Sequence, residues 1–466
     1  MRSGTYVGCF KAYDVRGRVP QELNPPLARF IGRAYAALIH PRKVAVGHDV
    51  RSTSPELVAA LCEGLTESGV DVVDIGLVGT EEVYFATFSL GLDGGIMVTA
   101  SHNPRDYNGM KFTREQGRPI SADTGLLQME ETVMEELRRD GYVHWAPPAR
   151  DESVPRGTVS KADTRPKYVE HLLTYIDVSK LRPLKIVANA GYGGAGPVLD
   201  MLEKSLPFQF VKLNHVPDGS FPAGVPNPML PENRVVTAEA VVAEKADLGI
   251  AWDGDFDRCF FFDETGGFVE GYYLVGLLAG RALKRHPGAA IIHDPRLVWN
   301  TEEIVREAGG TPVVSKSGHA FIKEKMRAVD AAYGGEMSAH HYFKEFSYCD
   351  SGMIPWLQVA EAVCEQGRPL SAMVSERIAK YPVSGEINLT LGDPLRALAA
   401  VKDRYRSAAL GVDEIDGLSM EFARWRFNVR MSNTEPVVRV NVETRADKDL
   451  LREKTQELLD ALEKAG

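Results

Sequence analysis

The chain has 466 residues, which is too many for a single hydrophobic core and predicts three or four domains. Its hydrophobic content of 44% and charged content of 25% are those of an ordinary soluble globular protein. The net charge of −10 argues against nucleic acid as the main partner, because proteins that bind the phosphate backbone usually present a basic face. An anionic small substrate remains compatible with this charge, since a local basic pocket can form in an acidic protein.

Three further features predict a cytoplasmic protein that does not enter a membrane. The first 11 residues lack the apolar core of a signal peptide. No stretch approaches the roughly 20 apolar residues that span a bilayer, and the most apolar one, residues 272–279, is predicted to be a packed helix. The cysteines have no metal-ligand spacing and are predicted to be reduced thiols: Cys9, Cys62, Cys259, Cys349 and Cys364.

The first part of the chain alternates between strand and helix patterns. Residues 10–17 are predicted to form a loop that presents Arg16. A helix is predicted to begin at Ser54, with Ser54 as N-cap and Pro55 at the first helical position. The alternation indicates βαβ units in a mainly parallel sheet. The other predicted helices are residues 26–38 and 81–88, and the predicted strands are residues 43–46, 70–75 and 95–99.

A proline-rich linker at residues 144–155 predicts the first domain boundary, and the strand–helix pattern then restarts twice. The last portion alternates short strands and closes on a helix at residues 448–462, which is typical of an α+β domain. We therefore predict three tandem related α/β domains with mixed sheets and a smaller C-terminal α+β domain. The predicted ranges are 1–150, 151–267, 268–375 and 376–466. Later strands are predicted at residues 184–188, 208–213, 248–252, 289–293, 311–314, 387–391, 419–422, 427–430 and 437–442.

An apolar strand leads into Thr99-Ala100-Ser101-His102-Asn103-Pro104, which we call the serine loop. Ligands of open α/β sheets gather at the carboxyl ends of strands, so this loop is a candidate site. A hydroxyl beside an imidazole is compatible with an activated nucleophile, a phosphorylated residue or a capped turn. His102 and Lys111 are candidates for acting on a substrate hydroxyl, although several other histidines also follow strands and spacing does not select a base.

Asp253, Asp255 and Asp257 stand at every second position after a predicted strand. An extended backbone would point all three the same way, toward one hard cation such as Mg²⁺. Without a cation, carboxylates this close together would repel one another and take up protons. Three alternatives are a solvated acidic turn, an EF-hand, and a phosphatase with Asp253 as nucleophile. Arg258 stands where an EF-hand needs glycine, and a phosphatase would leave Ser101 unexplained.

Arg258 follows the acidic triplet and is placed to grip a phosphate. A second phosphate cradle is predicted in the loop that contains Arg430, Ser432, Asn433 and Thr434, with Arg439 nearby. Glu336 and Ser338 suit two neighbouring sugar hydroxyls. The glycine-rich residues 191–196 match neither the dinucleotide nor the Walker pattern and are predicted to form a tight turn. This combination suggests phosphoryl transfer to or from a sugar in a central cleft between domains.

These four motifs resemble those of the phosphohexomutase family, and the resemblance extends from Phe10 to the C-terminus. The serine loop resembles the family's phosphoserine loop, and the acidic triplet with Arg258 resembles its metal loop. Gly335-Glu336-Met337-Ser338-Ala339-His340 resembles the sugar-binding loop, and Arg430-Met431-Ser432-Asn433-Thr434 resembles the phosphate-binding loop. Residues 10–17, 336–341 and 384–388 are most similar to the bacterial members that act on mannose phosphates for GDP-mannose synthesis.

The resemblance implies that phosphorylated Ser101 transfers its phosphoryl group to mannose 6-phosphate or mannose 1-phosphate. It also implies that Ser101 and the acidic triplet bind Mg²⁺. A mannose 1,6-bisphosphate intermediate then returns its other phosphate, and a hexose 1,6-bisphosphate acts as activator. His102 becomes a candidate proton donor. The partners are small hexose phosphates, without nucleic acid or membrane, and the protein is a monomer or homodimer. The implied catalytic residues are Ser101, His102, Lys111, Arg16 and Arg258, and the implied substrate-binding residues are Tyr13, Arg296, His319, Glu336, Ser338, His340, Arg430, Ser432, Asn433, Thr434 and Arg439.

Three alternatives to a mutase that is specific for mannose phosphates stay open, and the last of them is not an enzyme. The first is a mutase that accepts both mannose and glucose phosphates, because few contacts read the stereochemistry at C2. The second, a mutase for glucosamine phosphate, is disfavoured by Met337 in the sugar loop. The third is an inactive sugar-phosphate binder, which the intact Ser101 and acidic triplet disfavour. One departure from the family pattern is Ala339, which stands where many relatives carry glycine and predicts a stiffer sugar loop.

Overall fold

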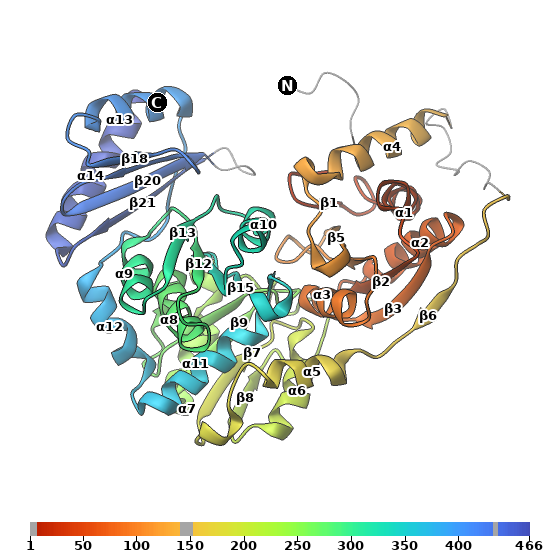
Figure 1. Cartoon of the computed structure of the whole chain (residues 1–466), viewed down its shortest axis with the longest axis horizontal. Helices are drawn as coiled ribbons and strands as arrows, with labels where there is room; N and C mark the ends of the chain where they lie inside the picture. Colours follow the sequence, from red (N-terminus) through yellow and green to blue (C-terminus); the bar gives the residue numbers. More distant parts are fainter. Residues whose placement is uncertain (1–6, 140–151, 432–436) are drawn as a thin grey trace. The chain divides into compact units, whose positions relative to one another are not determined.

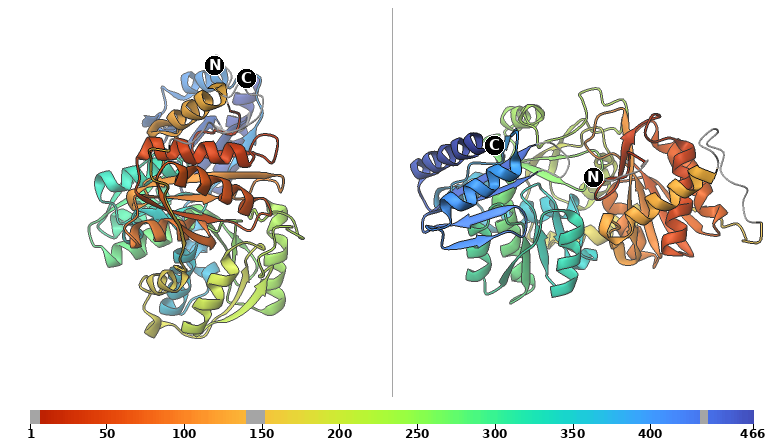
Figure 2. Two further views of the ribbon diagram at one scale, coloured as in Figure 1. Left: turned by 90° about the vertical axis from the view of Figure 1, so that its right-hand side faces the viewer. Right: turned by 90° about the horizontal axis from the view of Figure 1, so that it is seen from above.

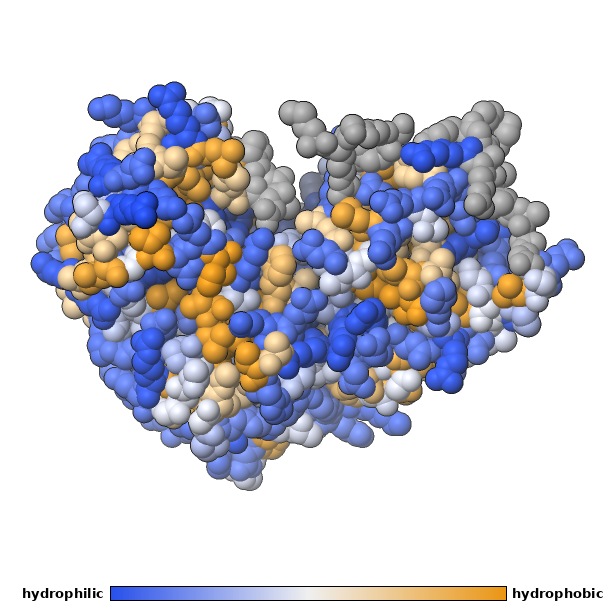
Figure 3. Space-filling view, turned by 45° about the horizontal axis from the view of Figure 1, so that its top comes forward, coloured by the Kyte–Doolittle hydropathy of each residue, from blue (hydrophilic) through white to orange (hydrophobic). Residues whose placement is uncertain are grey.

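The computed structural model describes residues 7–139, 152–431 and 437–466 (Figure 1). These residues form four sheets and fall into two compact units. The first unit is Met1–Phe262 with Glu345–Glu365, and the second unit is Asp263–Lys344 with Gln366–Gly466. In the described part of the chain, no helix is both long enough and apolar enough to cross a bilayer. The face drawn in Figure 3 is mostly hydrophilic, with apolar residues in small patches.

The first sheet has the strand order β1-β5-β4-β2-β3-β6. Strands β4, β2, β3 and β6 are parallel to one another. Strand β5 runs antiparallel to β4, and β1 runs antiparallel to β5. The sheet is therefore mixed. Its strands are β1 (Val15–Arg18), β2 (Lys43–His48), β3 (Asp71–Leu77), β4 (Gly94–Val98), β5 (Tyr107–Arg114) and β6 (Val159–Lys161).

Three details of this sheet differ from the sequence predictions. The predicted loop at residues 10–17 includes the start of β1, because Val15 is buried and pairs with Met110 on β5. Strand β5 itself was not predicted. Strand β6 lies beyond residue 150, the predicted end of the first domain, yet it hydrogen-bonds to β3 of the first sheet.

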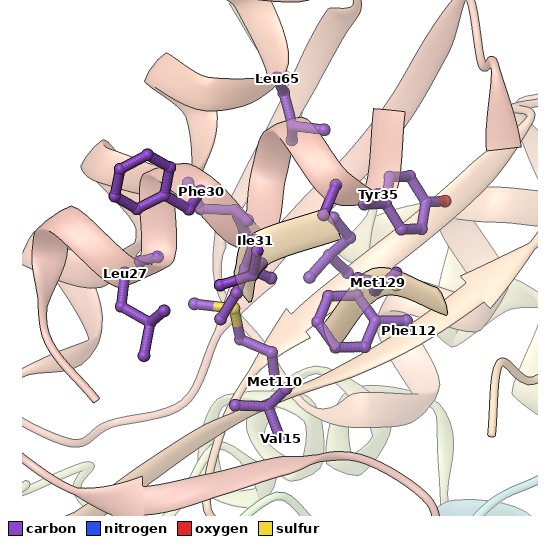
Figure 4. Packing of buried hydrophobic residues seen from close by; sticks show 14 of the residues in the cluster. Val15, Leu27, Phe30, Ile31, Tyr35, Leu65, Met110, Phe112 and Met129 are labelled. Carbon is purple, nitrogen blue, oxygen red and sulfur yellow. The ribbon is translucent and has the colours of Figure 1, made fainter. Parts of the chain in front are cut away.

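Both faces of the first sheet are buried, because alternate residues of its central strands point to opposite sides. One face packs with α1 (Pro25–Ile39), α2 (Ser54–Glu67) and α4 (Leu126–Arg139). Figure 4 shows this core, in which Tyr35 of α1 stacks on Phe112 of β5 with ring centroids 6.0 Å apart. On the opposite face, Ala45, Val73 and Met97 pack with α3 (Thr80–Ser89).

The start of α2 corrects one prediction. Ser54 is the first residue of the helix and not its N-cap, which is Thr53. The Ser54 hydroxyl is used elsewhere, since it donates to Asp49 Oδ1 at 2.7 Å. This bond links the helix to the polar segment that follows β2.

The second sheet has the order β11-β10-β9-β7-β8, with β7, β8 and β9 parallel and β10 antiparallel to β9. Helix α11 (Met353–Gln366) comes much later in the chain, but its Trp356 packs edge-on against Trp252 of β9. The strands are β7 (Lys185–Asn189), β8 (Gln209–Leu213), β9 (Leu248–Trp252), β10 (Cys259–Phe262) and β11 (Phe268–Val269), and the other helices are α5 (Arg165–Leu173), α6 (Ala195–Leu202) and α7 (Val235–Glu244).

The third sheet, ordered β13-β12-β14-β15-β16, has the same arrangement of a central strand between two parallel neighbours. Strand β15 runs antiparallel to β14. The strands are β12 (Ala290–His293), β13 (Thr311–Val314), β14 (Tyr333–Gly335), β15 (His341–Phe343) and β16 (Cys349–Asp350), and the helices are α8 (Gly271–Arg285), α9 (Trp299–Glu307), α10 (His319–Val329) and α12 (Leu370–Lys380).

The fourth sheet, ordered β17-β21-β20-β19-β18, is antiparallel throughout. Its two helices cover one face of the sheet (Figure 2) and share an apolar core with it. This agrees with the predicted α+β domain. The elements are β17 (Ile387–Leu389), α13 (Pro394–Tyr405), β18 (Gly411–Asp413), β19 (Leu418–Glu421), β20 (Trp425–Met431), β21 (Val438–Thr444) and α14 (Lys448–Ala465).

Candidate active site

Ser101 lies in the loop between β4 and β5 and is only 4% exposed. Its backbone has a φ of 47°, a left-handed conformation that is unfavourable for a residue with a Cβ atom. The Ser101 N–H donates to Thr99 Oγ1 at 2.8 Å, and the Ser101 hydroxyl donates to Asp253 Oδ2 at 2.8 Å. The fold thus brings together the serine loop and the acidic triplet, which are far apart in the sequence.

The three carboxylates of Asp253, Asp255 and Asp257 lie in the turn between β9 and β10, with oxygens within 4.8 Å of one another. The predicted clustering is confirmed, but the predicted reason is wrong. The segment is not extended, and Phe256 adopts a left-handed φ of 42°. The carboxylates converge because this turn folds them inward, not because strand residues alternate.

The acidic triplet fits a hard divalent cation. Oδ1 of Asp253 and Oδ1 of Asp255 are buried and have no hydrogen-bond partner in the described part of the chain. Buried carboxylate oxygens without partners are costly, and a cation with oxygen ligands such as Mg²⁺ satisfies several of them at once. The donor set therefore suits the predicted metal.

Two cations already contact the triplet. Lys111 Nζ on β5 lies 2.7 Å from Asp255 Oδ2 and 2.5 Å from Asp257 Oδ2. Arg258 donates through Nη2 to Asp253 Oδ2 at 2.6 Å and to the Ser101 hydroxyl at 3.4 Å. Burial alone would lower the pKa of Lys111, but the carboxylates of Asp255 and Asp257 raise it above its usual value. The ammonium form is therefore favoured.

His102 lies beside this cluster, with Nδ1 3.1 Å from the Ser101 hydroxyl and 2.5 Å from Arg258 Nη2. Burial, together with the charges of Arg258 and Arg16, lowers the pKa of His102 well below its ordinary value. The neutral imidazole is favoured, and a neutral ring accepts a proton more readily than it donates one. In this state His102 is suited to accept a proton first, and its role as a proton donor stays a prediction.

Arg16 lies on β1 next to the serine loop. Its Nε donates to Asp14 at 2.9 Å, and its Nη1 donates to Asn103 Oδ1 at 3.3 Å. Tyr13 precedes β1 in the same segment and is half-buried. The antiparallel pairing of β1 with β5 explains why the N-terminal segment reaches the loop at residue 101.

Sequence reasoning missed two groups in the first unit. Thr80, at the start of α3, donates its hydroxyl to Asp255 Oδ2 at 2.6 Å. Arg51 follows β2 and donates to backbone carbonyls of the serine loop. Thr80 gives no signal in the sequence. Arg51 belongs to a short polar segment after a strand, which could have marked it.

In the second unit, the sugar loop follows β14. The Glu336 carboxylate is 3% exposed and accepts from the Tyr342 hydroxyl at 2.6 Å and the Gly318 N–H at 2.9 Å. Ser338 Oγ lies 3.4 Å from His340 Nδ1. Ala339 adopts a left-handed φ of 71°, the conformation that makes glycine favourable at this position.

Three arginines of the second unit surround Glu386, which was not predicted as a site residue. Its carboxylate lies 3.5 Å from Arg296, 3.5 Å from Arg430 and 3.4 Å from Arg439. Burial and the nearby charge of Arg296 lower the pKa of Arg430. Arg296 also contacts Asp294 and Glu336, and Arg430 also contacts Asp416, so carboxylates balance the three guanidinium groups. Guanidinium groups gathered in this way suit a phosphate that takes the place of a carboxylate.

The remaining predicted residues are placed as follows. His319 is the first residue of α10 and is half-buried. Ser432, Asn433 and Thr434 lie outside the described residues. The serine and metal loops belong to the first unit, whereas the sugar loop, Arg430 and Arg439 belong to the second.

Comparison with known proteins identifies the family. Four family models match in order, and they describe domains I, II and III and the C-terminal domain of phosphoglucomutase/phosphomannomutase, at residues 8–138, 166–267, 270–381 and 386–461. A phosphomannomutase of Salmonella montevideo is 57% identical over 459 residues, covering 97% of this chain and 98% of that protein. A Xanthomonas campestris protein called phosphohexose mutases is 58% identical over 453 residues, covering 97% and 98%.

A solved structure from Burkholderia thailandensis agrees with this result. It is described as a phosphoglucomutase/phosphomannomutase family protein and matches with a TM-score of 0.84 and 33% identity, over 97% of each chain. The chain belongs to the phosphoglucomutase/phosphomannomutase family and is an enzyme of the isomerase class that transfers a phosphoryl group within its substrate. The predicted family and the predicted fold class are confirmed.

Proposed function

We propose that this enzyme interconverts mannose 6-phosphate and mannose 1-phosphate through a phosphorylated Ser101 and a mannose 1,6-bisphosphate intermediate. One observation carries the proposal: the buried Ser101 hydroxyl lies 2.8 Å from a carboxylate of the acidic triplet, with Arg258 beside it. A metal site facing a hydroxyl suits a phosphate on that hydroxyl. The curated relatives named phosphomannomutase support mannose as the sugar.

In the first half-reaction, the bond between phosphorus and Ser101 Oγ breaks and a bond to a substrate hydroxyl oxygen forms. The proton of that hydroxyl passes to a base, for which the neutral His102 is placed beside the serine. Lys111, an ammonium beside the metal loop, is a candidate proton donor. Arg16 and Arg258 spread the negative charge of the transferring group. In the second half-reaction, the bond between the other phosphorus and its sugar oxygen breaks and a bond to Ser101 Oγ forms, which restores the phosphoenzyme. The released sugar oxygen takes up a proton and becomes the hydroxyl of the product.

Mg²⁺, held by Asp253, Asp255, Asp257 and the Ser101 phosphate, would supply Lewis-acid stabilisation of the phosphoryl oxygens. We propose that Glu336 and Ser338 bind ring hydroxyls, with His319 and His340 near the sugar. Arg296, Arg430 and Arg439, together with Ser432, Asn433 and Thr434, bind the phosphate that does not react, and Tyr13 contacts substrate. A hexose 1,6-bisphosphate would rephosphorylate enzyme that has lost its phosphate, and the product would supply GDP-mannose synthesis in the cytoplasm.

The phosphoserine is tested by intact-mass measurement and turnover. We expect a phosphate-sized adduct on the wild-type enzyme that is absent from Ser101→Ala, with turnover reduced at least about 1,000-fold because the phosphoryl carrier is gone. Ser68→Ala, at the end of α2, is the matched control and should keep both. Equal turnover in wild type and Ser101→Ala would refute the mechanism. Removal of divalent cations with a chelator should also abolish turnover, and added Mg²⁺ should restore it.

A second candidate is a dual-specificity enzyme for mannose and glucose phosphates. It is favoured by the Xanthomonas relative whose name specifies hexoses and not mannose. Turnover of mannose 1-phosphate and glucose 1-phosphate, each with Mg²⁺ and a trace of the matching bisphosphate, separates the two. A similar kcat/KM for both sugars would select the dual enzyme, and no turnover of either would exclude a mutase.

A further inference from the structure

The sequence His-Asp-x-Arg occurs twice in this chain, as His48-Asp49-Val50-Arg51 and His293-Asp294-Pro295-Arg296. The first copy follows β2 and the second follows β12, and each of these strands lies between two parallel neighbours. One neighbour in each sheet, β4 or β14, leads into a functional loop. The last residue of the motif strand pairs with the last residue before that loop: His48 with Val98, and His293 with Gly335. The two copies therefore occupy the same topological position.

The internal bonds of the two copies also agree. The histidine Nδ1 lies against the carbonyl oxygen of the next residue, at 2.8 Å in the first copy and 3.0 Å in the second. The arginine N–H donates to the aspartate Oδ1 at 3.0 Å in both. In both, the histidine carbonyl accepts from the residue just after the other parallel neighbour, at 2.9 Å and 3.0 Å. The element is a repeated local structure and not a chance match of letters.

In the first copy, the side chains bind the serine loop. The Arg51 guanidinium is buried and donates to four backbone carbonyls, at distances of 2.7 to 2.9 Å. Three belong to the loop, at Ser101, Asn103 and Pro104, and the fourth belongs to Tyr107 at the start of β5. Asp49 Oδ2 accepts from Thr99 Oγ1 at 2.8 Å, and the same Thr99 oxygen accepts from the Ser101 N–H. The strained backbone of Ser101 is thus held from both sides.

In the second copy, the aspartate binds the sugar loop directly. Asp294 Oδ2 accepts from the Met337 N–H at 3.0 Å. Asp294 also holds Arg296 by two bonds of 2.9 Å each. Arg296 contacts no loop carbonyl among the bonds described, and its Nη2 lies 3.8 Å from Glu336. The same element therefore contacts a loop in both sheets, but the guanidinium of the second arginine faces the carboxylates of Asp294, Glu336 and Glu386.

The second sheet provides a contrast. Its central strand β7 ends at Asn189, followed by Ala190 and Gly191, and has no arginine at the corresponding position. Asn189 Oδ1 accepts from the Gly191 N–H at 3.1 Å and does not extend to the metal loop. Asp255 of that loop is held instead by Thr80 and Lys111. We call the His-Asp-x-Arg element bound to its neighbouring loop the clamp. In the residues that the structure describes, it is present only beside the two loops proposed to carry the phosphate and to bind the sugar.

We propose that Asp49 and Arg51 are positioning residues for phosphoryl transfer, and that the duplicated His-Asp-x-Arg element fixes the loop after the neighbouring strand. The kinetic part of this proposal rests on the proposed function of Ser101. Arginine is required in the first copy because its planar fork serves four carbonyls at once, whereas a lysine ammonium has three donors around a single nitrogen.

The test compares Arg51→Lys with a matched control, Arg29→Lys, in the full-length enzyme. Arg29 is on α1 and pairs with Glu67 away from the serine loop. Hydrogen exchange followed by mass spectrometry reports on residues 99–107 without relying on activity. We expect exchange in this peptide to become about tenfold faster in Arg51→Lys and to be unchanged in Arg29→Lys. We also expect kcat to fall about 100-fold in Arg51→Lys with KM changed less than about threefold, because substrate still binds but Ser101 is misplaced.

If Arg51→Lys does not fold, Asp49→Asn tests the first copy of the element in its place. We expect it to show the same faster exchange in residues 99–107 and the same fall in kcat. Asp294→Asn tests the second copy: exchange in residues 336–340 should accelerate, and KM should rise while kcat changes little. Wild-type exchange in residues 99–107 of Arg51→Lys and Asp49→Asn would overturn the proposal, as would equal losses of kcat in Arg51→Lys and Arg29→Lys. An inactive wild-type enzyme would refute the proposed function alone, because the exchange data still test the clamp.

Discussion

At the scale of single residues, the site consists of charged groups that are buried together and neutralise one another. Removing one partner would leave a buried charge uncompensated, which typically costs about 3–5 kcal/mol. Lys111 and Asp255 are such a pair, with their charged atoms 2.7 Å apart. The sequence predicted both residues as part of the site. It could not predict that they contact each other, because 144 residues separate them along the chain.

Buried histidines give a testable pH dependence outside the site. His341 on β15 is fully buried, its Nδ1 lies 2.6 Å from the Tyr333 hydroxyl, and burial lowers its pKa to about 3. In the unfolded chain the pKa is about 6.5, so below this pH the unfolded state binds the proton first. The stability that the neutral ring provides is present above about pH 6.5 and is lost as the pH falls toward 3.

We therefore expect unfolding free energy measured between pH 6.5 and 4 to depend less on pH in His341→Asn than in wild type. Asparagine can keep a bond to the Tyr333 hydroxyl but does not titrate. His40→Asn, at the exposed end of α1, is the control and should keep the wild-type profile. Parallel profiles for wild type and His341→Asn would contradict this assignment.

At the scale of elements, the candidate functional groups of each unit lie in loops at the carboxyl ends of parallel strands. Strand β4 delivers Ser101, β9 the acidic triplet and β14 Glu336, as expected for α/β sheets. One helix and one antiparallel strand complete the serine–metal site, through Thr80 of α3 and Lys111 of β5. The fourth sheet supplies Arg430 and Arg439 from adjacent antiparallel strands, where they are direct partners in the register.

The three arginines around Glu386 predict how this carboxylate affects anion binding. Glu386 competes with a phosphate for the same guanidinium groups, so its removal should strengthen phosphate binding. We expect Glu386→Gln to lower the Kd for inorganic phosphate about threefold to tenfold, measured by calorimetry at fixed ionic strength. Glu414→Gln, which removes an exposed partner of Lys402 in the same domain, should leave the Kd unchanged. Weaker phosphate binding by Glu386→Gln would show that Glu386 supports the arginines instead of competing with the ligand.

At the scale of the whole molecule, the second unit joins the third and fourth sheets through a buried ionic network. Arg426 on β20 contacts Glu443 on β21 at 2.9 Å and donates to the carbonyls of Pro295 and Arg296. Glu443 also accepts from the N–H of Val298 at 2.7 Å and from the hydroxyl of Tyr272. Because the carbonyls belong to the segment that carries Arg296, this network connects the stability of the unit to the phosphate site.

We expect Arg426→Met to destabilise the second unit by about 3 kcal/mol, because Glu443 would remain buried without its cation. Hydrogen exchange should increase in the third and fourth sheets and stay unchanged in the first. The double variant Arg426→Met with Glu443→Gln should be less destabilised than the sum of the two single variants. If Arg426→Met increased hydrogen exchange as much in the first sheet as in the second unit, the effect of Arg426 would not be confined to the second unit and the prediction would be wrong.

The sequence by itself indicated the fold class and the main candidate motifs, because strand–helix alternation and clustered polar residues are local patterns. The family followed from the resemblance of four of these motifs to those of known proteins. The sequence also placed most strands within a few residues. It failed where long-range contacts decide the structure: β1 and β6 become strands only by pairing with β5 and β3. It gave the wrong backbone for the acidic triplet, since a turn and not a strand gathers the carboxylates.

Only the tertiary structure decided which cation meets which carboxylate, and that Thr80, Arg51 and Glu386 belong to the sites. Ser101 illustrates the physical reason. Its hydroxyl, its neighbour His102 and its strand are visible in the sequence, but its left-handed backbone is held by Thr99 and Arg51 and its hydroxyl by Asp253. These bonds exist only when separate strands end at the same edge of a sheet or on neighbouring sheets. The residue types fix which chemistry is available, and the fold fixes which atoms are close enough to perform it.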